Sequence, residues 1–310
     1  DEILFEGATF GDLLGRPGPV AIATGTDIST GSRLAFFQND FDLLCSDLNK
    51  VNLSRAAATS SAVPVALSAV TFNNYGGTCG YQYPAWVKDI ADLENRARPA
   101  GRAVQRYREM QAFQNSKDRP YIHLVDGGVA DNLGVRGVLE VLDELAVSSA
   151  FRGELGFGDV RRIVLLVVNA RSARKTDWDR HESPPGFIGQ LLQASGVPIE
   201  RYSFETIELM KDRAEIMKWR RELMVARARL AGATEAEAEA SVPKITLHTI
   251  DVSFDEIPDP EERALFMNLP TSFVLPAEDI DRLREIAGRL LRQSTEYKSL
   301  ISDLGGIPAR

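Results

Sequence analysis

Apolar residues along this chain gather in short runs that are separated by polar and glycine-containing segments. Where such a run is continuous and rich in β-branched residues, it is typical of a strand that is covered on both faces of a sheet. This pattern predicts strands at residues 19–24, 33–37, 121–126, 161–169 and 244–252. The run at 161–169 shows no polar alternation, and we therefore predict a central parallel strand there.

The first two predicted strands are joined by a turn at residues 27–31, which ends in glycine. Strands linked by so short a segment pair as a hairpin, and we expect this hairpin at an edge of the sheet. Further along, the segment 54–62 consists almost entirely of small side chains, with Ser54 as a helix cap and Pro64 after its end. A helix of this composition can pack closely against a sheet, so we predict tight packing here.

Helices are predicted where apolar residues recur every three or four positions. Besides 54–62, these segments are 39–49, 136–145, 186–193, 200–230 and 278–302, with a short helix or exposed connector at 233–240. The segment 96–117 is polar and poor in aliphatic residues, so we expect a surface helix or a mobile insertion.

The order of these elements predicts the fold class. Strand 121–126, helix 136–145 and strand 161–169 follow one another, which indicates a βαβ unit. We therefore expect a three-layer α/β domain with a largely parallel central sheet over residues 1–171. Residues 172–310 are richer in helical pattern and are expected to form a helix-rich extension that packs on the same domain.

Composition and charge narrow the classes of partner. The chain has 310 residues, is 44% hydrophobic and carries a formal charge of -8. Nucleic-acid binding takes most of its affinity from Lys and Arg that neutralise phosphates, so an acidic chain argues against a nucleic-acid partner. The longest purely aliphatic run has six residues, at 163–168, and a membrane-spanning helix needs about 20. No bilayer-spanning helix is expected.

The predicted helix at 200–230 leans basic, with eight Lys or Arg against five Asp or Glu between residues 201 and 230. Two interpretations stay open. The excess of positive charge would attract an anionic lipid surface, which would give peripheral membrane contact. A solvated helix face with intrahelical ion pairs has the same composition, and it is the more common structure.

The chain contains two cysteines, Cys45 and Cys79. Two thiols are too few for a disulfide framework or for a zinc site with four cysteine ligands. Both cysteines stand in loop-like surroundings, so one disulfide between them and two separate thiols remain as alternatives.

The strongest candidate for chemistry is Asp126, which ends the strand at 121–126 and is followed directly by Gly127 and Gly128. A strand fixes the position of its last residue, and glycines after it allow a sharp turn and the close approach of a second backbone or a substrate. A carboxylate in this place can be a general base, a metal ligand or a cap for the following turn.

Two of the other chemical interpretations find little support in the spacing. Asp126, Asp131 and Asn132 lack the alternating oxygen ligands of a calcium loop, so no metal is expected. His123 lies on the same strand but faces away from the acid, and we predict a packing role for it. A Ser-His-Asp hydrolase that uses His123 or His248 is a rival hypothesis, although neither histidine follows an acid in a late loop.

Four segments resemble the patatin-like phospholipases, in bacterial form, and they occur in the order of that family. Asp126-Gly127-Gly128 after an apolar strand is similar to the Asp-Gly-Gly/Ala box of these enzymes. Residues 24–31, Thr-Gly-Thr-Asp-Ile-Ser-Thr-Gly, resemble the segment before a strand in the family. Residues 59–64, Thr-Ser-Ser-Ala-Val-Pro, and the opening 7–14 are similar to two further family segments.

The resemblance implies a lipid acyl hydrolase, a phospholipase A or carboxylic ester hydrolase with phospholipid or another acyl-ester lipid as substrate and with no cofactor. In that family a serine on a Gly-x-Ser-x-Gly turn is the nucleophile and the Asp of the box is its base. The resemblance therefore assigns Asp126 as general base and Gly127 and Gly128 as its active-site loop. A hydroxyl needs such a base because it is a weak nucleophile until its proton is taken.

No Gly-x-Ser-x-Gly occurs in the 310 residues. The nearest string, 7–11, has Thr9 at the central position and lacks a preceding apolar strand, while Ser60 and Ser61 lack flanking glycines. The nucleophile is therefore expected upstream, in a longer protein, and the chain alone is expected to be inactive.

The alternative to an enzyme is a non-catalytic patatin-like scaffold that binds lipid or a protein partner. Many bacterial relatives resemble secreted or envelope proteins, so the cell envelope or secretion is favoured over the cytoplasm, in agreement with a disulfide between Cys45 and Cys79.

Overall fold

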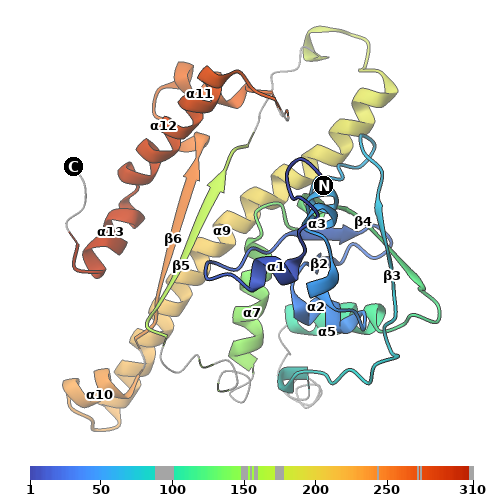
Figure 1. Ribbon diagram of the computed structural model, residues 1–310. Coiled ribbons are helices and arrows are strands. Elements are labelled where there is room, and N and C mark those ends of the chain that lie inside the picture. Colours follow the sequence, from blue (N-terminus) through green and yellow to red (C-terminus); the bar gives the residue numbers. More distant parts are fainter. Residues whose placement is uncertain are drawn as a thin grey trace. The chain divides into compact units, whose positions relative to one another are not determined.

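The computed structural model describes residues 1–87, 101–147, 153, 156, 160–171, 178–242, 244–270, 272 and 274–306. It contains two compact units (Figure 1). The first unit comprises Asp1–Gly158 and Phe187–Ser203, and the second comprises Asp159–Gly186 and Phe204–Arg310. Each unit has its own sheet and its own hydrophobic core, so the two are described in turn.

The sheet of the first unit is antiparallel. Its strands lie in the order β2 (Arg33–Ala35), β1 (Thr24–Asp27), β4 (Tyr121–Asp126) and β3 (Val70–Asn73), and each neighbouring pair is antiparallel. The predicted largely parallel central sheet is therefore wrong for the described residues. The order strand, helix, strand along the chain favours a parallel βαβ unit, but β4 pairs with β1 and β3 and with no described strand that follows it.

The second unit has a two-stranded parallel sheet. Strands β5 (Arg162–Asn169) and β6 (Thr246–Ser253) pair in parallel along their whole length. Strand β5 is parallel as predicted, but it pairs with β6 and lies in a different sheet from β4, so the predicted βαβ unit is wrong. Alternate residues of β5 are also solvent-accessible, with exposed fractions of 42% at Val164 and 63% at Val168. Coverage on both faces was therefore predicted wrongly for this strand.

The helices of the first unit include the part of α9 up to residue 203, and α3 and α6 contact its sheet. The short ones are α1 (Phe10–Leu14), α2 (Gln38–Leu43), the 3-10 turn η1 (Leu48–Lys50) and α6 (Gly128–Asp131). The longer ones are α3 (Leu53–Ser60), α5 (Gly101–Phe113), α7 (Val135–Val147) and α9 (Phe187–Leu230).

Three of these helices test the predictions directly. Helix α3 contacts β1 closely, as its small side chains predicted: a Cβ added at Gly25 would clash with Thr59. The helix predicted at 136–145 is confirmed, since α7 covers these residues. Helix α5 corrects the expectation of a surface or mobile segment, because Met110 and Phe113 are buried in the main core with Ile122 and Leu124. Residues 96–100 of that segment lie outside the described residues.

Two expectations about strands near the N-terminus have opposite outcomes. The hairpin of β1 and β2 around residues 27–31 is confirmed, and β2 is an edge strand. The predicted buried strand at 19–24 is wrong, because β1 begins only at Thr24 while Val20 and Ile22 are more than half exposed.

The second unit contains the rest of α9 and the C-terminal helices. These are α10 (Glu235–Ser241), α11 (Pro260–Met267), α12 (Ala277–Gln293) and α13 (Thr295–Asp303), with 3-10 turns η3 (Trp178–Arg180) and η4 (Phe254–Glu256). Helix α9 is continuous through Pro198, so the two predicted helices at 186–193 and 200–230 are one. The predicted helix at 278–302 is two, because Ser294 caps α13 by accepting the N–H of Tyr297.

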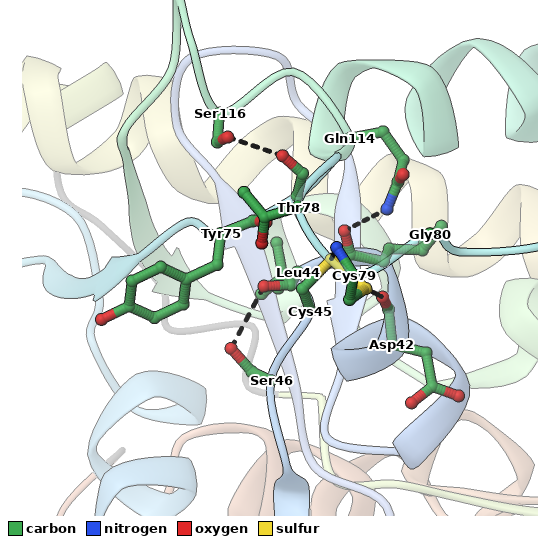
Figure 2. Close-up of a disulfide and its surroundings, with 12 residues drawn as sticks. Asp42, Leu44, Cys45, Ser46, Tyr75, Thr78, Cys79, Gly80, Gln114 and Ser116 are labelled. Carbon is green, nitrogen blue, oxygen red and sulfur yellow. Dashed lines mark hydrogen bonds between the residues drawn. A yellow bond between two sulfur atoms is a disulfide. The ribbon is translucent and has the colours of Figure 1, made fainter.

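A disulfide joins Cys45 to Cys79, with 5.6 Å between their Cα atoms. It ties the second residue after α2 to the loop that follows β3 (Figure 2). The surrounding backbone is held as well, since Gln114 donates to the carbonyl of Leu43 and Ser116 donates to the carbonyl of Gly76. Of the two alternatives that the sequence left open, the structure has the disulfide. No helix in the described part of the chain has the length and apolar character needed to cross a membrane.

Candidate active site

Three segments that are distant in sequence meet at Asp126. Strand β4 brings Asp126 opposite Gly25 of β1. On the other side, the backbone N–H of Asp126 donates to the carbonyl of Ala62, 2.9 Å away, just after α3. The segments at 24–31, 56–64 and 121–128 therefore meet at the backbone of Asp126.

The carboxylate of Asp126 caps the turn that follows it. Its Oδ1 accepts the backbone N–H of Gly128 at 2.7 Å. Among the described residues no other group forms a hydrogen bond or ion pair with this carboxylate. Burial raises the pKa of Asp126, and the N–H of Gly128 opposes part of that rise. A half-buried carboxylate of raised pKa is a stronger base than an exposed one, so the cap and the general-base interpretations are compatible.

Gly127 is required by close approach. Its backbone is in the ordinary right-handed helical region, with φ -61° and ψ -26°. A Cβ at this position would lie 2.5 Å from the carbonyl oxygen of Thr24, well inside van der Waals contact. A Cβ at Gly128 would lie 3.0 Å from Oδ1 of Asp126. The two glycines thus let β1 pass directly against the turn and keep space beside the acid, as the sequence predicted.

Thr26 connects the turn to β1 and was missed in the sequence. Its hydroxyl donates to the carbonyl of Asp126 at 2.9 Å and accepts the N–H of Ala130 at 3.1 Å. The hydroxyl is buried and bridges the end of β4 to α6. The sequence feature that could have predicted this role is the position of Thr26 in the segment 24–31, directly after Gly25, which lies opposite Asp126.

Substitution of Gly127 tests this close packing. Gly127→Ala should lower the free energy of unfolding by about 1–3 kcal/mol, because the added methyl forces β1 and the turn apart. Gly18→Ala is the matched control, since a Cβ at Gly18 meets no atom within 4 Å. Urea denaturation followed by circular dichroism measures both variants. An equal, small effect for the two would contradict the packing described above.

Asp131 and Asn132 have structural partners. Asp131 is buried and accepts the backbone N–H groups of Arg136 and Gly137, at 3.2 and 3.0 Å, at the start of α7. Asn132 donates to the hydroxyl of Ser203 at 3.0 Å. Both residues therefore hold the segment after the turn in place.

Neither candidate histidine bonds to Asp126. His123 is exposed on β4, with its Nδ1 3.0 Å from the hydroxyl of Thr71, so the predicted packing role is wrong. The alternation of the strand places it on the face opposite Ile122 and Leu124, whose side chains are in the core. His248 is buried in the second unit, where its Nε2 lies 3.4 Å from Oδ2 of Asp303.

The hydroxyls considered as nucleophiles are engaged in local structure. Thr9 caps α1 in a reciprocal pair with Asp12. Ser61 donates to the carbonyl of Ala57 at 2.7 Å, one turn back. No hydroxyl within the described ranges forms a hydrogen bond with the carboxylate of Asp126.

Comparison with known proteins adds no relative: no family model, curated protein or solved structure matches the chain.

Proposed function

We propose that this chain carries the general base of a lipid acyl hydrolase that acts through a Ser-Asp dyad. Asp126 is the base, and the serine belongs to a segment upstream of the chain. The observation that carries the proposal is the carboxylate itself, half-buried at a strand end, with Oδ1 held by Gly128 and with no described partner on Oδ2.

The chemistry assigned to these residues is proton transfer. Oδ2 of Asp126 takes the proton of the serine hydroxyl as the hydroxyl oxygen attacks the ester carbonyl carbon, and later gives it to the leaving alkoxide. The N–H of Gly128 keeps Oδ1 in place and so aims Oδ2. Because burial raises the pKa of Asp126, the carboxylate binds this proton more firmly than an exposed aspartate would.

A scaffold without catalytic activity is the second candidate. One observation favours it. The hydroxyls of Thr9 and Ser61, two candidate nucleophiles, form hydrogen bonds with residues of their own helical segments. On this alternative the turn at Asp126 serves only to hold β1, β4 and α7 together, and the protein binds lipid or a partner.

The disulfide supports a location outside the cytoplasm. Disulfides persist in oxidising compartments and are rare where thiols are kept reduced. We therefore propose the cell envelope or secretion as the location of the protein. The proposed acyl-ester lipid substrate and peripheral membrane contact rest on the resemblance to the patatin-like phospholipases.

A fluorophosphonate probe, which labels activated serines, tests the proposal. The 310-residue chain should be neither labelled nor able to hydrolyse a short-chain phosphatidylcholine. A protein that continues upstream through a Gly-x-Ser-x-Gly segment should show both reactions, and replacement of that serine by alanine should abolish them. Labelling of the shorter chain would overturn the upstream nucleophile, and an unlabelled longer protein would favour the scaffold.

A further inference from the structure

The first unit contains a cavity of about 570 Å³ that does not include Asp126 in its lining. This volume is within the range of small-molecule sites. Aromatic and aliphatic side chains from α2, α5, α7 and neighbouring loops form much of its wall: Phe37, Leu43, Tyr81, Trp86, Met110, Val141. Such walls lower the hydration of a charged group that lies against them, although Phe37 and Val141 remain 39% and 40% exposed.

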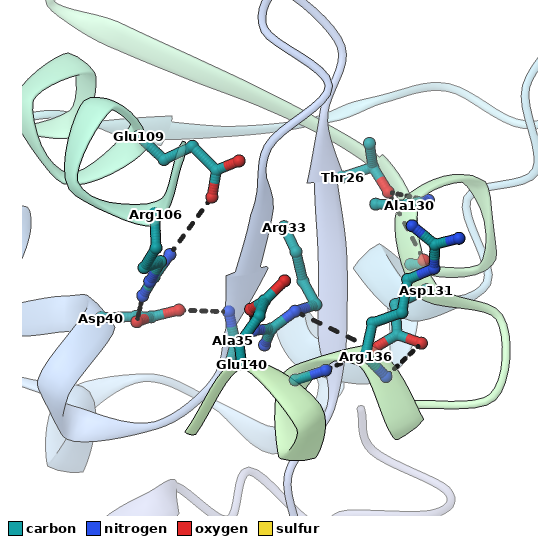
Figure 3. A network of polar contacts seen from close by, with 12 residues as sticks. Thr26, Arg33, Ala35, Asp40, Arg106, Glu109, Ala130, Asp131, Arg136 and Glu140 are labelled. Atoms are coloured by element: carbon teal, nitrogen blue, oxygen red, sulfur yellow. Dashed lines mark hydrogen bonds and ion pairs between the residues drawn. The ribbon is translucent and has the colours of Figure 1, made fainter. Parts of the chain in front are cut away.

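The two cations of the cavity are already paired. Arg33 of β2 lies 2.6 Å from Glu140 of α7, and Arg106 of α5 is bonded to Asp40 of α2 (Figure 3). Asp40 also accepts the backbone N–H of Ala35 at 2.7 Å. Each pair is neutral as a whole, so neither arginine offers an uncompensated positive charge to a ligand.

One further donor of each arginine is buried near another carboxylate. Nε of Arg33 is buried 3.9 Å from Asp131, and Nη1 of Arg106 is buried 3.7 Å from Glu109. Atoms that are buried in this way are not accessible from the cavity. These two donors are therefore closed to an anionic ligand.

Glu144 of α7 is the unmatched charge. The residue is 8% exposed and its side chain lines the cavity. No described residue forms a hydrogen bond or an ion pair with its carboxylate. A carboxylate that is largely removed from water and has no partner gains more from a cation than an exposed carboxylate would.

We propose that this cavity binds a small organic cation, an ammonium group attached to an apolar chain, with Glu144 as its counter-ion. The aromatic rings of Phe37, Tyr81 and Trp86 suit the ammonium, because a cation is attracted to the face of an aromatic ring. The aliphatic wall takes the apolar chain. This proposal does not depend on the proposed hydrolase activity.

A free ammonium compound fits the cavity better than the headgroup of a phospholipid. The carboxylate of Asp42, which forms no ion pair with a described residue, also lines the cavity, in addition to Glu144. A phosphodiester next to the ammonium would bring a negative charge among these groups, and like charges repel. The occupant is therefore a molecule whose only charge is positive.

Binding should depend on pH near neutrality. Burial raises the pKa of Glu144 to about 7, and Arg106 opposes part of this rise while Glu140 and Asp40 add to it. Burial also raises the pKa of Tyr81 to about 12, so this phenol stays neutral. Since only ionised Glu144 pairs with a cation, affinity should rise about tenfold between pH 6 and pH 8.

Isothermal titration calorimetry of the 310-residue chain with hexyltrimethylammonium tests the proposal, because this probe stays charged at every pH. Hexanol and hexanoate, which carry the same chain without the cation, should bind at least tenfold more weakly. Glu144→Gln should weaken binding of the cation by roughly ten- to a hundredfold and should leave hexanol unaffected. Asp118→Asn, which removes one exposed charge outside the cavity, should change neither affinity.

Phe37→Leu removes one aromatic ring from the wall and should weaken binding of the cation several-fold, which keeps the test open if Glu144→Gln fails to fold. Equal binding of cation and alcohol, or unchanged affinity in both variants, would overturn the proposal. Dihexanoylphosphatidylcholine, titrated below its micellar concentration, should bind more weakly than hexyltrimethylammonium. Tighter binding of the phospholipid would overturn the assignment to a free ammonium compound.

Discussion

Asp126→Asn should lower kcat/KM for acyl-ester hydrolysis by about 100- to 10,000-fold in a protein that includes the upstream serine. The asparagine side chain keeps an oxygen that can accept the N–H of Gly128, so the turn should persist. It cannot take a proton from the serine. Measurement of hydrolysis rates on a short-chain phosphatidylcholine, together with circular dichroism, separates loss of the base from loss of the fold.

Asp47→Asn is the matched control for this substitution. Oδ1 of Asp47 accepts the backbone N–H of Asn49, two residues on, at 3.0 Å, as Oδ1 of Asp126 does with Gly128. The two substitutions therefore make the same change to the same kind of turn, but Asp47 is exposed and away from β4. Full activity of the Asp126→Asn protein would show that Asp126 is only a cap and would overturn its assignment as the general base.

Removal of the disulfide should have the largest effect on stability. Cys45 and Cys79 are 34 residues apart in sequence, and a cross-link of that span restricts the unfolded chain by about 4 kcal/mol at 25 °C. We expect the double variant Cys45→Ala/Cys79→Ala to lose about this much free energy of unfolding. Urea denaturation in the presence and absence of a reductant measures the loss.

The reductant supplies the control. It should destabilise the natural sequence to a similar extent and should leave the double variant unchanged. A loss below about 1 kcal/mol would contradict the expected contribution and would show that the loop around Cys79 is held mainly by its hydrogen bonds. One of those bonds comes from Ser116, which donates to the carbonyl of Gly76.

The sequence correctly predicted those elements whose structure depends on residues close together in the chain. The hairpin of β1 and β2 depends on a short turn, and α7 depends on one apolar face. The direction of β4 depends on which strands reach it from residues 24–27 and 70–73, and no local pattern encodes that choice. Likewise α5 has few aliphatic residues, yet Met110 and Phe113 are enough to place it in the core.

In the candidate site, too, the sequence predicted the residues that depend on local pattern and missed those that depend on the folded chain. Asp126 and its glycines were recognisable because the strand, the acid and the turn are adjacent in sequence. The bridging hydroxyl of Thr26 acts across 100 residues, so only the folded chain shows it. Glu144 looks like one more acid on an amphipathic helix. Its isolation becomes apparent only when α2, α5 and β2 enclose it.

The contact between Gly127 and β1 also constrains how this protein can diverge. Among backbone atoms, the carbonyl oxygen of residue 24 would lie nearest to a Cβ at position 127. Every amino acid has this oxygen. No replacement at position 24 can therefore compensate for a larger residue at 127. Relatives that keep this backbone path should retain glycine at 127 while residue 24 varies, and this asymmetry gives a criterion for recognising them among distant sequences.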